Sequence, residues 1–201
     1  GRADLRPDSA MGALAAASAR DLTASAPPSE GNVGAGTGAS VGKMFGMKLA
    51  MKSGLGTASM DIGGGVIGGA IVAVNAFGDV IDPKTGEIIA GLRSGKVGLL
   101  RVGKKDLFAD TLAMMKNPIG RGILGFASRS NTVIGAVATN AKLTKAQATK
   151  VAQMAQDGLA RTIRPAHTML DGDVIFALST GAKKADVSIV GAFAAEVVAQ
   201  A

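Results

Sequence analysis

Apolar positions along this chain follow two periods, one typical of strands and one typical of helices. The β-branched run VIGGAIVAVNA, residues 66–76, has the length of a strand and predicts a buried one. The stretch DVIDPKTGEIIAG, residues 79–91, consists of two apolar runs around an Asp-Pro-Lys-Thr-Gly turn, which predicts a hairpin. The runs TVIGAVATN from Thr132 and DVIFALSTG from Asp173 predict two further strands.

Helical spacing is clearest from Lys145 onward, after a predicted N-cap at Thr144 and a capping-box partner at Gln147. Its apolar face comprises Ala148, Val151, Ala152, Ala155 and Leu159. Further helices are predicted over residues 9–19, over KDLFADTLAMMKNP up to Pro118, and over the C-terminal DVSIVGAFAAEVVAQA. The stretch NPIGRGILGFASRSN shows no period and predicts a loop. Strands and helices mix, which predicts an α+β fold, and we expect residues 1–201 to form a single domain.

Composition is that of a globular chain, with 47% hydrophobic and 18% charged residues. No apolar run is long enough to span a bilayer, so we expect no membrane partner, and the N-terminus does not resemble a signal peptide. Cysteine is absent, which excludes a disulfide framework, a thiolate nucleophile and a zinc–thiolate site. These features favour a cytoplasmic location.

The formal net charge of +7 is concentrated between residues 93 and 131, where eight Lys or Arg stand against two Asp. Trp and Tyr are absent and the six Phe are scattered, so no platform for stacking bases is present. We therefore interpret residues 93–131 as a basic, loosely structured linker and expect no nucleic-acid partner.

The glycine-rich stretch GNVGAGTGASVGKM, residues 31–44, invites a comparison with nucleotide-binding loops. A P-loop requires Gly where Thr37 stands and Ser or Thr where Met44 stands. The looser dinucleotide pattern requires a preceding strand, but the Pro-Pro segment SAPPSEGNV precedes it. The glycines instead indicate a close approach of the backbone to another group. No cluster of carboxylates and histidines has metal-ligand spacing, so we expect neither metal nor cofactor.

Ordered sequence blocks carry a family resemblance over nearly all 201 residues. They are EGNVGAGTGASVGK, GLGTAS, AVNAFGDVIDPKTGEIIAG, the Asn131-Thr132 junction, LTKAQA, DGLARTIRPAHT and DGD. Together they resemble the self-processing L-aminopeptidase/D-esterase family, which includes β-peptidyl aminopeptidases and the nylon-oligomer hydrolase. The resemblance implies a four-layer α/β/β/α sandwich of the N-terminal-nucleophile-hydrolase type. It also implies a domain that is longer on its N-terminal side, so we expect the fold of this chain to be incomplete there.

The same resemblance implies that the chain cuts its own backbone between Asn131 and Thr132. The products would be residues 1–131, ending in the basic segment, and residues 132–201. A freed α-amine titrates near ~8 and therefore accepts the proton of its own side-chain hydroxyl at neutral pH. Thr132 would then supply both nucleophile and base. The junction alone is also typical of a strand-initiating Thr after a turn-forming Asn.

Asp171 and Asp173 form the second candidate pair. In an extended segment, residues i and i+2 face the same side, so both carboxylates would reach one site, hold an α-ammonium and orient the Thr132 hydroxyl. The alternative is a solvated turn. Resemblance to the nylon-oligomer hydrolase implies catalytic roles for Asp171 and Asp173. The β-peptidyl aminopeptidases carry Ser and Glu at these two positions.

The resemblance also assigns Asn75 to an oxyanion hole and Lys43 to a place beside the nucleophile. Asn75 could equally be a buried amide that is simply paired, and Lys43 a surface lysine. Gly36, Gly38 and the single histidine, His167, are expected to contact substrate. His167 is interpreted as structural or site-lining, because the α-amine already supplies a base.

The function expected from these features is that of an N-terminal-threonine hydrolase. It would act as an aminopeptidase, amidase or esterase on short peptides, amides or esters, as a homo-oligomer of cleaved heterodimers. Two alternatives stay open. One is an acyltransferase similar to the ornithine acetyltransferases, and the other is a catalytically inactive fragment that serves as a subunit or binding surface.

Overall fold

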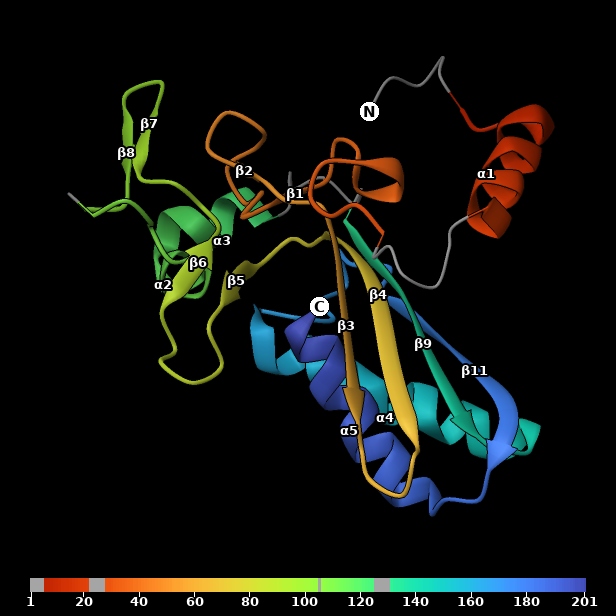
Figure 1. Cartoon of the computed structure of the whole chain (residues 1–201). Helices are drawn as coiled ribbons and strands as arrows, with labels where there is room; N and C mark the ends of the chain where they lie inside the picture. The colour runs from red at the N-terminus through yellow and green to blue at the C-terminus, as the bar shows by residue number, and fades with distance from the viewer. Residues whose placement is uncertain (1–5, 22–27, 105, 125–130) are drawn as a thin grey trace.

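The computed structural model describes residues 6–21, 28–104, 106–124 and 131–201. Its centre is a four-stranded sheet in the order β11-β9-β4-β3 (Figure 1). The strands are β3 (Leu55–Asp61), β4 (Ile67–Asn75), β9 (Thr132–Ala141) and β11 (Val174–Lys183). β4 runs antiparallel to β3 and β9, and β11 runs parallel to β9.

The strands β4, β9 and β11 confirm the strands predicted from apolar runs. No strand was predicted at the position of β3. The sequence of β3, LGTASMD, has no continuous apolar run, so its strand conformation follows from pairing with β4 rather than from its own pattern. The turn between β3 and β4 includes Gly63, Gly64 and Gly65, all with positive φ, which L-residues with a side chain rarely adopt.

Helices α4 (Lys145–Thr162) and α5 (Val187–Gln200) cover one face of the sheet (Figure 1). The predicted capping box of α4 is confirmed: the Thr144 hydroxyl accepts from the Gln147 N–H, and the Gln147 side chain accepts from the Thr144 N–H. α4 also makes the crossover that the parallel pair β9 and β11 requires. Aliphatic side chains fill this core, among them Val72, Val133, Val137, Val151, Leu159 and Val197.

The opposite face of the sheet exposes apolar side chains. Ile134 is 53% exposed and Phe176 58% exposed, and Ile71 also faces outward. The described residues thus supply one sheet and one helix layer of the expected sandwich. Because side chains alternate along strands, Thr132 shares this open face with Ile134 two residues later, and its register partner Asn75 lies beside it.

Smaller elements gather beyond one end of the sheet (Figure 1). They are η1 (Gly34–Gly36), β1 (Ser40–Val41), β2 (Met51–Lys52), β5 (Asp79–Ile81), β6 (Ile88–Ala90), β7 (Gly95–Val97), β8 (Leu100–Val102), α2 (Thr111–Lys116), α3 (Pro118–Leu124) and β10 (Ile163–Arg164). The predicted hairpin is confirmed as β5–β6, to which β10 adds a third strand. The N-terminal helix α1 (Ser9–Asp21) confirms the helix predicted over residues 9–19.

A second hydrophobic core stabilises these smaller elements. It contains Met44, Phe45, Leu49, Phe77, Leu92, Val102 and Ala109. Asp79 ties the segments around it together, since its buried carboxylate accepts hydrogen bonds from the Leu92 N–H and from both the N–H and the hydroxyl of Thr111. Burial raises the pKa of Asp79. These three bonds compensate for removing the carboxylate from water.

The expectation of a loosely structured basic linker is wrong over most of its length. Residues 95–102 form the β7–β8 hairpin, and α2 and α3 follow. The predicted loop from residue 117 is also wrong over Pro118–Leu124, which forms α3. Proline is well tolerated in the first turn of a helix, so Pro118 ends one helix and begins the next. Residues 125–130 of this predicted loop lie outside the described residues.

Among the described helices, none combines the length and the apolar character needed to cross a membrane.

Gly158 permits the close packing of α4 on α5, and this generates a test of the core. A Cβ at Gly158 would lie 2.4 Å from the carbonyl oxygen of Ala195 and 2.7 Å from the Val198 Cβ. Gly158→Ala is therefore expected to destabilise the fold by about 2 kcal/mol despite its gain in helix propensity. The matched control Gly12→Ala, on α1, meets nothing within 4 Å. Calorimetry measures the Tm of both variants. A wild-type Tm in Gly158→Ala would contradict the packing argument.

Candidate active site around Thr132

Thr132 is the first residue of β9 and lies where the main sheet meets the smaller elements. It pairs with Asn75, the last residue of β4. Its side chain is only partly exposed, and its hydroxyl donates a hydrogen bond to the carbonyl oxygen of the preceding residue, Asn131. The hydroxyl therefore lies next to the peptide bond that sequence reasoning selected for cleavage.

Asp171–Gly172–Asp173 continues the pairing of β11 with β9. Asn131 and Asp171 form a parallel bridge in the same register as Ile134 and Val174. The Gly172 N–H donates to the Asn131 carbonyl oxygen over 2.9 Å. A Cβ at position 172 would lie 3.0 Å from the Thr132 hydroxyl oxygen, so glycine gives the hydroxyl its space.

The carboxylates of Asp171 and Asp173 are held by different partners. Asp171 accepts from the Phe77 N–H at 3.0 Å, and from the N–H and hydroxyl of Thr168 at 3.1 and 2.6 Å. Asp173 accepts from the Val133 N–H at 2.8 Å, and its other oxygen lies 2.8 Å from His167 Nδ1. The Asp173 side chain is only 5% exposed, so this segment is not a solvated turn.

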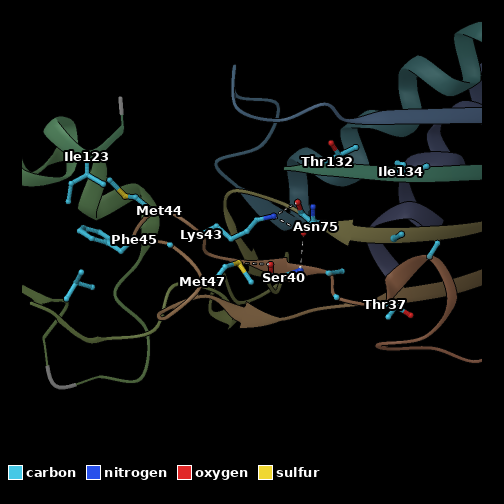
Figure 2. A pocket seen from close by; sticks show the side chains of 16 residues that line it. Thr37, Ser40, Lys43, Met44, Phe45, Met47, Asn75, Ile123, Thr132 and Ile134 are labelled. Atoms are coloured by element: carbon cyan, nitrogen blue, oxygen red, sulfur yellow. Dashed lines mark hydrogen bonds between the residues drawn. The ribbon is translucent and has the colours of Figure 1, made fainter. Parts of the chain in front are cut away.

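Lys43 is buried, with 7% of its surface exposed. Its ammonium donates to both oxygens of Asn75, at 2.9 Å to the backbone carbonyl and 2.7 Å to Oδ1 (Figure 2). The Ser40 N–H also donates to Asn75 Oδ1. Burial lowers the pKa of Lys43 to about 8, and the nearby Asp171 carboxylate partly offsets this effect. The neutral amine is thus a larger fraction of Lys43 near neutral pH than of an ordinary surface lysine.

The glycine-rich stretch of residues 31–44 places Lys43. Gly42 has a φ of +66°, and a Cβ there would lie 1.9 Å from the Leu92 nitrogen, so only glycine allows the backbone to pass. The Gly42 and Lys43 N–H groups then donate to the carbonyls of Gly78 and Phe77. Phe77 thus connects the lysine segment to Asp171. The close backbone approach expected from the glycines is to protein.

A cavity of about 810 Å³ opens beside Thr132, with Lys43 and Asn75 in its wall (Figure 2). Apolar side chains form much of the remaining surface, including Met44, Phe45, Met47, Val97, Ile123 and Ile134. Gly38, which was expected to contact substrate, lines the cavity. Gly36 and His167 are not among the described lining residues: Gly36 packs against the backbone of Leu55, and His167 contacts Asp173.

The described residues contain no group of three or more His, Cys, Asp or Glu side chains able to hold a metal ion.

Comparison with known proteins identifies the family. The model of peptidase family S58 matches residues 2–201. The chain belongs to peptidase family S58. It is 43% identical over 189 residues to an uncharacterized aminopeptidase of Mycobacterium leprae, covering 90% of this chain and 46% of the relative. It is 28% identical over 151 residues to the 6-aminohexanoate-oligomer endohydrolase of Paenarthrobacter ureafaciens, covering 75% and 39%. The chain thus spans less than half the length of these S58 relatives.

Two solved structures confirm the prediction of an α+β fold of the N-terminal-nucleophile-hydrolase type. The L-aminopeptidase D-Ala-esterase/amidase of Ochrobactrum anthropi, a variant of the Ntn hydrolase fold, matches with a TM-score of 0.56 at 22% identity, covering 91% of this chain and 46% of that one. A β-aminopeptidase of Burkholderia sp. matches with a TM-score of 0.50 at 27% identity, covering 87% and 45%. The family resemblance found in the sequence is confirmed.

Sequence reasoning missed three groups that hold the site together. The Phe77 N–H and the Thr168 hydroxyl both bind Asp171, and the Gly172 N–H binds the Asn131 carbonyl. Backbone donors have no side-chain signature, so the first and third have no signal in residue type. Thr168 and Gly172 do lie inside the RPAHT and DGD blocks, which are the signal that could have drawn attention to them.

The lowered pKa of Lys43 generates a direct test. We expect the Lys43 Cε resonance, assigned by its loss in Lys43→Arg, to titrate with a midpoint of about 8 instead of the ordinary 10.5. Asp171→Asn should lower the midpoint further, because the carboxylate favours the charged ammonium. NMR titration measures both values. A midpoint near 10.5, or no response to Asp171→Asn, would show that the lysine is not held as described.

Proposed function

We propose that the protein containing this chain is a self-processing N-terminal-threonine hydrolase that acts on short peptides, amides or esters. The observation that carries the proposal is the position of Thr132. Its hydroxyl touches the carbonyl oxygen of Asn131 on one side, and the residue lines the cavity with Lys43 and Asn75 on the other. Membership of a peptidase family supports hydrolysis of amide bonds.

Self-cleavage is the first reaction in this proposal. The Thr132 hydroxyl oxygen attacks the carbonyl carbon of Asn131, the peptide C–N bond breaks, and the hydroxyl proton ends on the departing nitrogen. The product is an ester between Asn131 and the Thr132 side chain, with a free α-amine. Water hydrolyses this ester to the Asn131 carboxylate and a free hydroxyl. The chain is then two pieces, residues 1–131 and 132–201, and Thr132 is an N-terminal residue.

Substrate hydrolysis uses the same hydroxyl a second time. The free α-amine of Thr132, titrating near ~8, accepts the hydroxyl proton while the oxygen attacks a substrate carbonyl in the cavity. The amine or alcohol product leaves with a proton, and water hydrolyses the acyl–Thr132 ester. Lys43 and Asn75 flank this position, so the ammonium and the amide are placed to stabilise the developing oxyanion.

The two carboxylates keep these groups in position. Asp171 lies near Lys43 and favours its charged form, while Asp173 binds the N–H of Val133, the residue next to the proposed new N-terminus. Because both carboxylates accept hydrogen bonds from backbone N–H groups, they are held in fixed positions.

The cavity supports a neutral, apolar acyl group as the preferred substrate portion. Lys43 is the charged side chain among the described lining residues, and methionine, phenylalanine, valine and isoleucine side chains line the cavity as well. The names of two S58 relatives, an aminopeptidase and a 6-aminohexanoate-oligomer endohydrolase, support peptides and linear amides as substrates of this protein.

The proposal predicts that purified wild-type protein contains two pieces, the smaller beginning Thr-Val-Ile-Gly. Thr132→Ala should give one uncut chain without amidase activity, because the hydroxyl is needed for both reactions. Thr132→Ser is the matched control, since it keeps the hydroxyl, and it should still be cut. Mass spectrometry and a denaturing gel measure the outcome. An uncut wild-type chain, or cleavage in Thr132→Ala, would overturn self-processing.

The carboxylates provide a second prediction. Asp171→Ala and Asp173→Ala should each lower kcat for a short amide substrate by roughly 100-fold, within the range expected when a group that positions proton transfer is lost. Asp157→Ala is the control, because Asp157 lies exposed on α4. Steady-state kinetics on the cleaved protein measures the effect. Wild-type turnover in either variant would show that its carboxylate has no part in catalysis.

A further inference from the structure

The Asn131 carbonyl oxygen faces Gly172, on the β11 side of β9, whereas Asn75 pairs with Thr132 from β4, on the other side. Asn131 is 1% exposed and is not among the described lining residues of the cavity, whereas Lys43, Asn75 and Thr132 are. The oxyanion formed during self-cleavage would therefore develop away from the groups that the proposed function assigns to substrate. A separate donor has to stabilise it.

The described contacts place such a donor at Gly172. Its N–H lies 2.9 Å from the Asn131 carbonyl oxygen, within the distance of an oxyanion-hole hydrogen bond. The Thr132 hydroxyl touches the same oxygen. We propose that the backbone N–H of Gly172 is the oxyanion donor for self-cleavage at Asn131, a catalytic role separate from that of Lys43 and Asn75 in substrate hydrolysis. This inference rests on the proposed self-processing function.

The segment around Gly172 is fixed before any reaction begins. The carboxylates on both sides of Gly172 accept hydrogen bonds from the main chain, Asp171 from Phe77 and Asp173 from Val133. The Asn131 side chain donates to the Leu170 carbonyl oxygen, which holds the residue carrying the reacting carbonyl. A donor held in advance stabilises the transition state without paying for reorganisation.

Glycine also leaves more room here than any other residue. A Cβ at position 172 would lie 3.0 Å from the Thr132 hydroxyl oxygen and 3.8 Å from the Asn131 carbonyl oxygen. Any side chain would therefore push against the nucleophile. The segment thus combines two features in one residue, a hydrogen-bond donor to the carbonyl and free space for the attacking hydroxyl.

The charge that the donor meets changes during the reaction. Attack by the Thr132 oxygen converts the Asn131 carbonyl into a tetrahedral centre with a negative oxygen, which accepts the Gly172 N–H more strongly than the neutral carbonyl does. Collapse breaks the C–N bond, moves the hydroxyl proton to the Thr132 nitrogen and regenerates a carbonyl. The donor is needed again when water attacks the resulting ester.

Amide-to-ester replacement tests the donor without adding a side chain. Glycolic acid in place of Gly172 replaces the N–H by an ester oxygen and adds no side chain. We expect it to slow self-cleavage by roughly 10²–10³-fold, the usual effect of losing one oxyanion donor. The matched control is the same replacement at Gly86, whose N–H donates to the Asp82 carbonyl oxygen at 2.7 Å in the hairpin turn. The Gly86 ester variant loses a similar hydrogen bond far from Thr132, so its chain should be cut at the wild-type rate. Mass spectrometry of the full chain over time measures the precursor, and thermal melting verifies that both proteins are folded.

Gly172→Ala distinguishes the two features of Gly172, its N–H donor and the space that it leaves for the Thr132 hydroxyl. This variant keeps the N–H and crowds the hydroxyl by a few tenths of an ångström, so it should cleave faster than the ester variant. Cleavage of the ester variant within threefold of wild type would overturn the role of the N–H. If the wild-type chain itself stays uncut, the proposed self-processing function fails. This outcome is distinguishable from a failure of the Gly172 proposal, in which the wild-type chain is still cut.

Discussion

The register of β9 between β4 and β11 is the constraint on which the rest of the site depends. It places Thr132 opposite Asn75 on one side, and Asn131 opposite Asp171 on the other. Since the side-chain period of a strand is two, a shift by one residue would turn the Thr132 hydroxyl toward the helices and remove it from the cavity. The buried valines of β9 and β4 hold this register, so packing of the core fixes the geometry of the chemistry.

The charged groups of the site lie where two hydrophobic cores meet. The main core carries Thr132 and Asn75 on its sheet, while the smaller core holds Phe77, whose N–H and carbonyl bind Asp171 and the Lys43 backbone. Burial between these layers lowers the pKa of Lys43. The same packing that stabilises the fold therefore makes the Lys43 ammonium a stronger acid than the ammonium of an exposed lysine.

Sequence patterns predicted the parts of this structure that depend on local periodicity or local capping. The valine-rich strand β4, the capping box of α4 and the β5–β6 hairpin each have such a signal. Sequence patterns did not predict two other segments. β3 is a strand because β4 pairs with it, and Pro118 begins a helix where a loop was predicted. For the site, the family blocks selected Thr132 and the two carboxylates. The backbone donors that hold them are invisible to residue type, since every residue except proline carries an N–H.

Covalent capture tests the central claim, that a threonine at a chain end is the nucleophile, most directly. The protein would be incubated with a slowly hydrolysed ester, quenched in acid, digested and analysed by tandem mass spectrometry. The account predicts an added acyl group on a peptide whose first residue is Thr132. An acyl group on another residue, or on Thr132 within a peptide that continues back through Asn131, would contradict it.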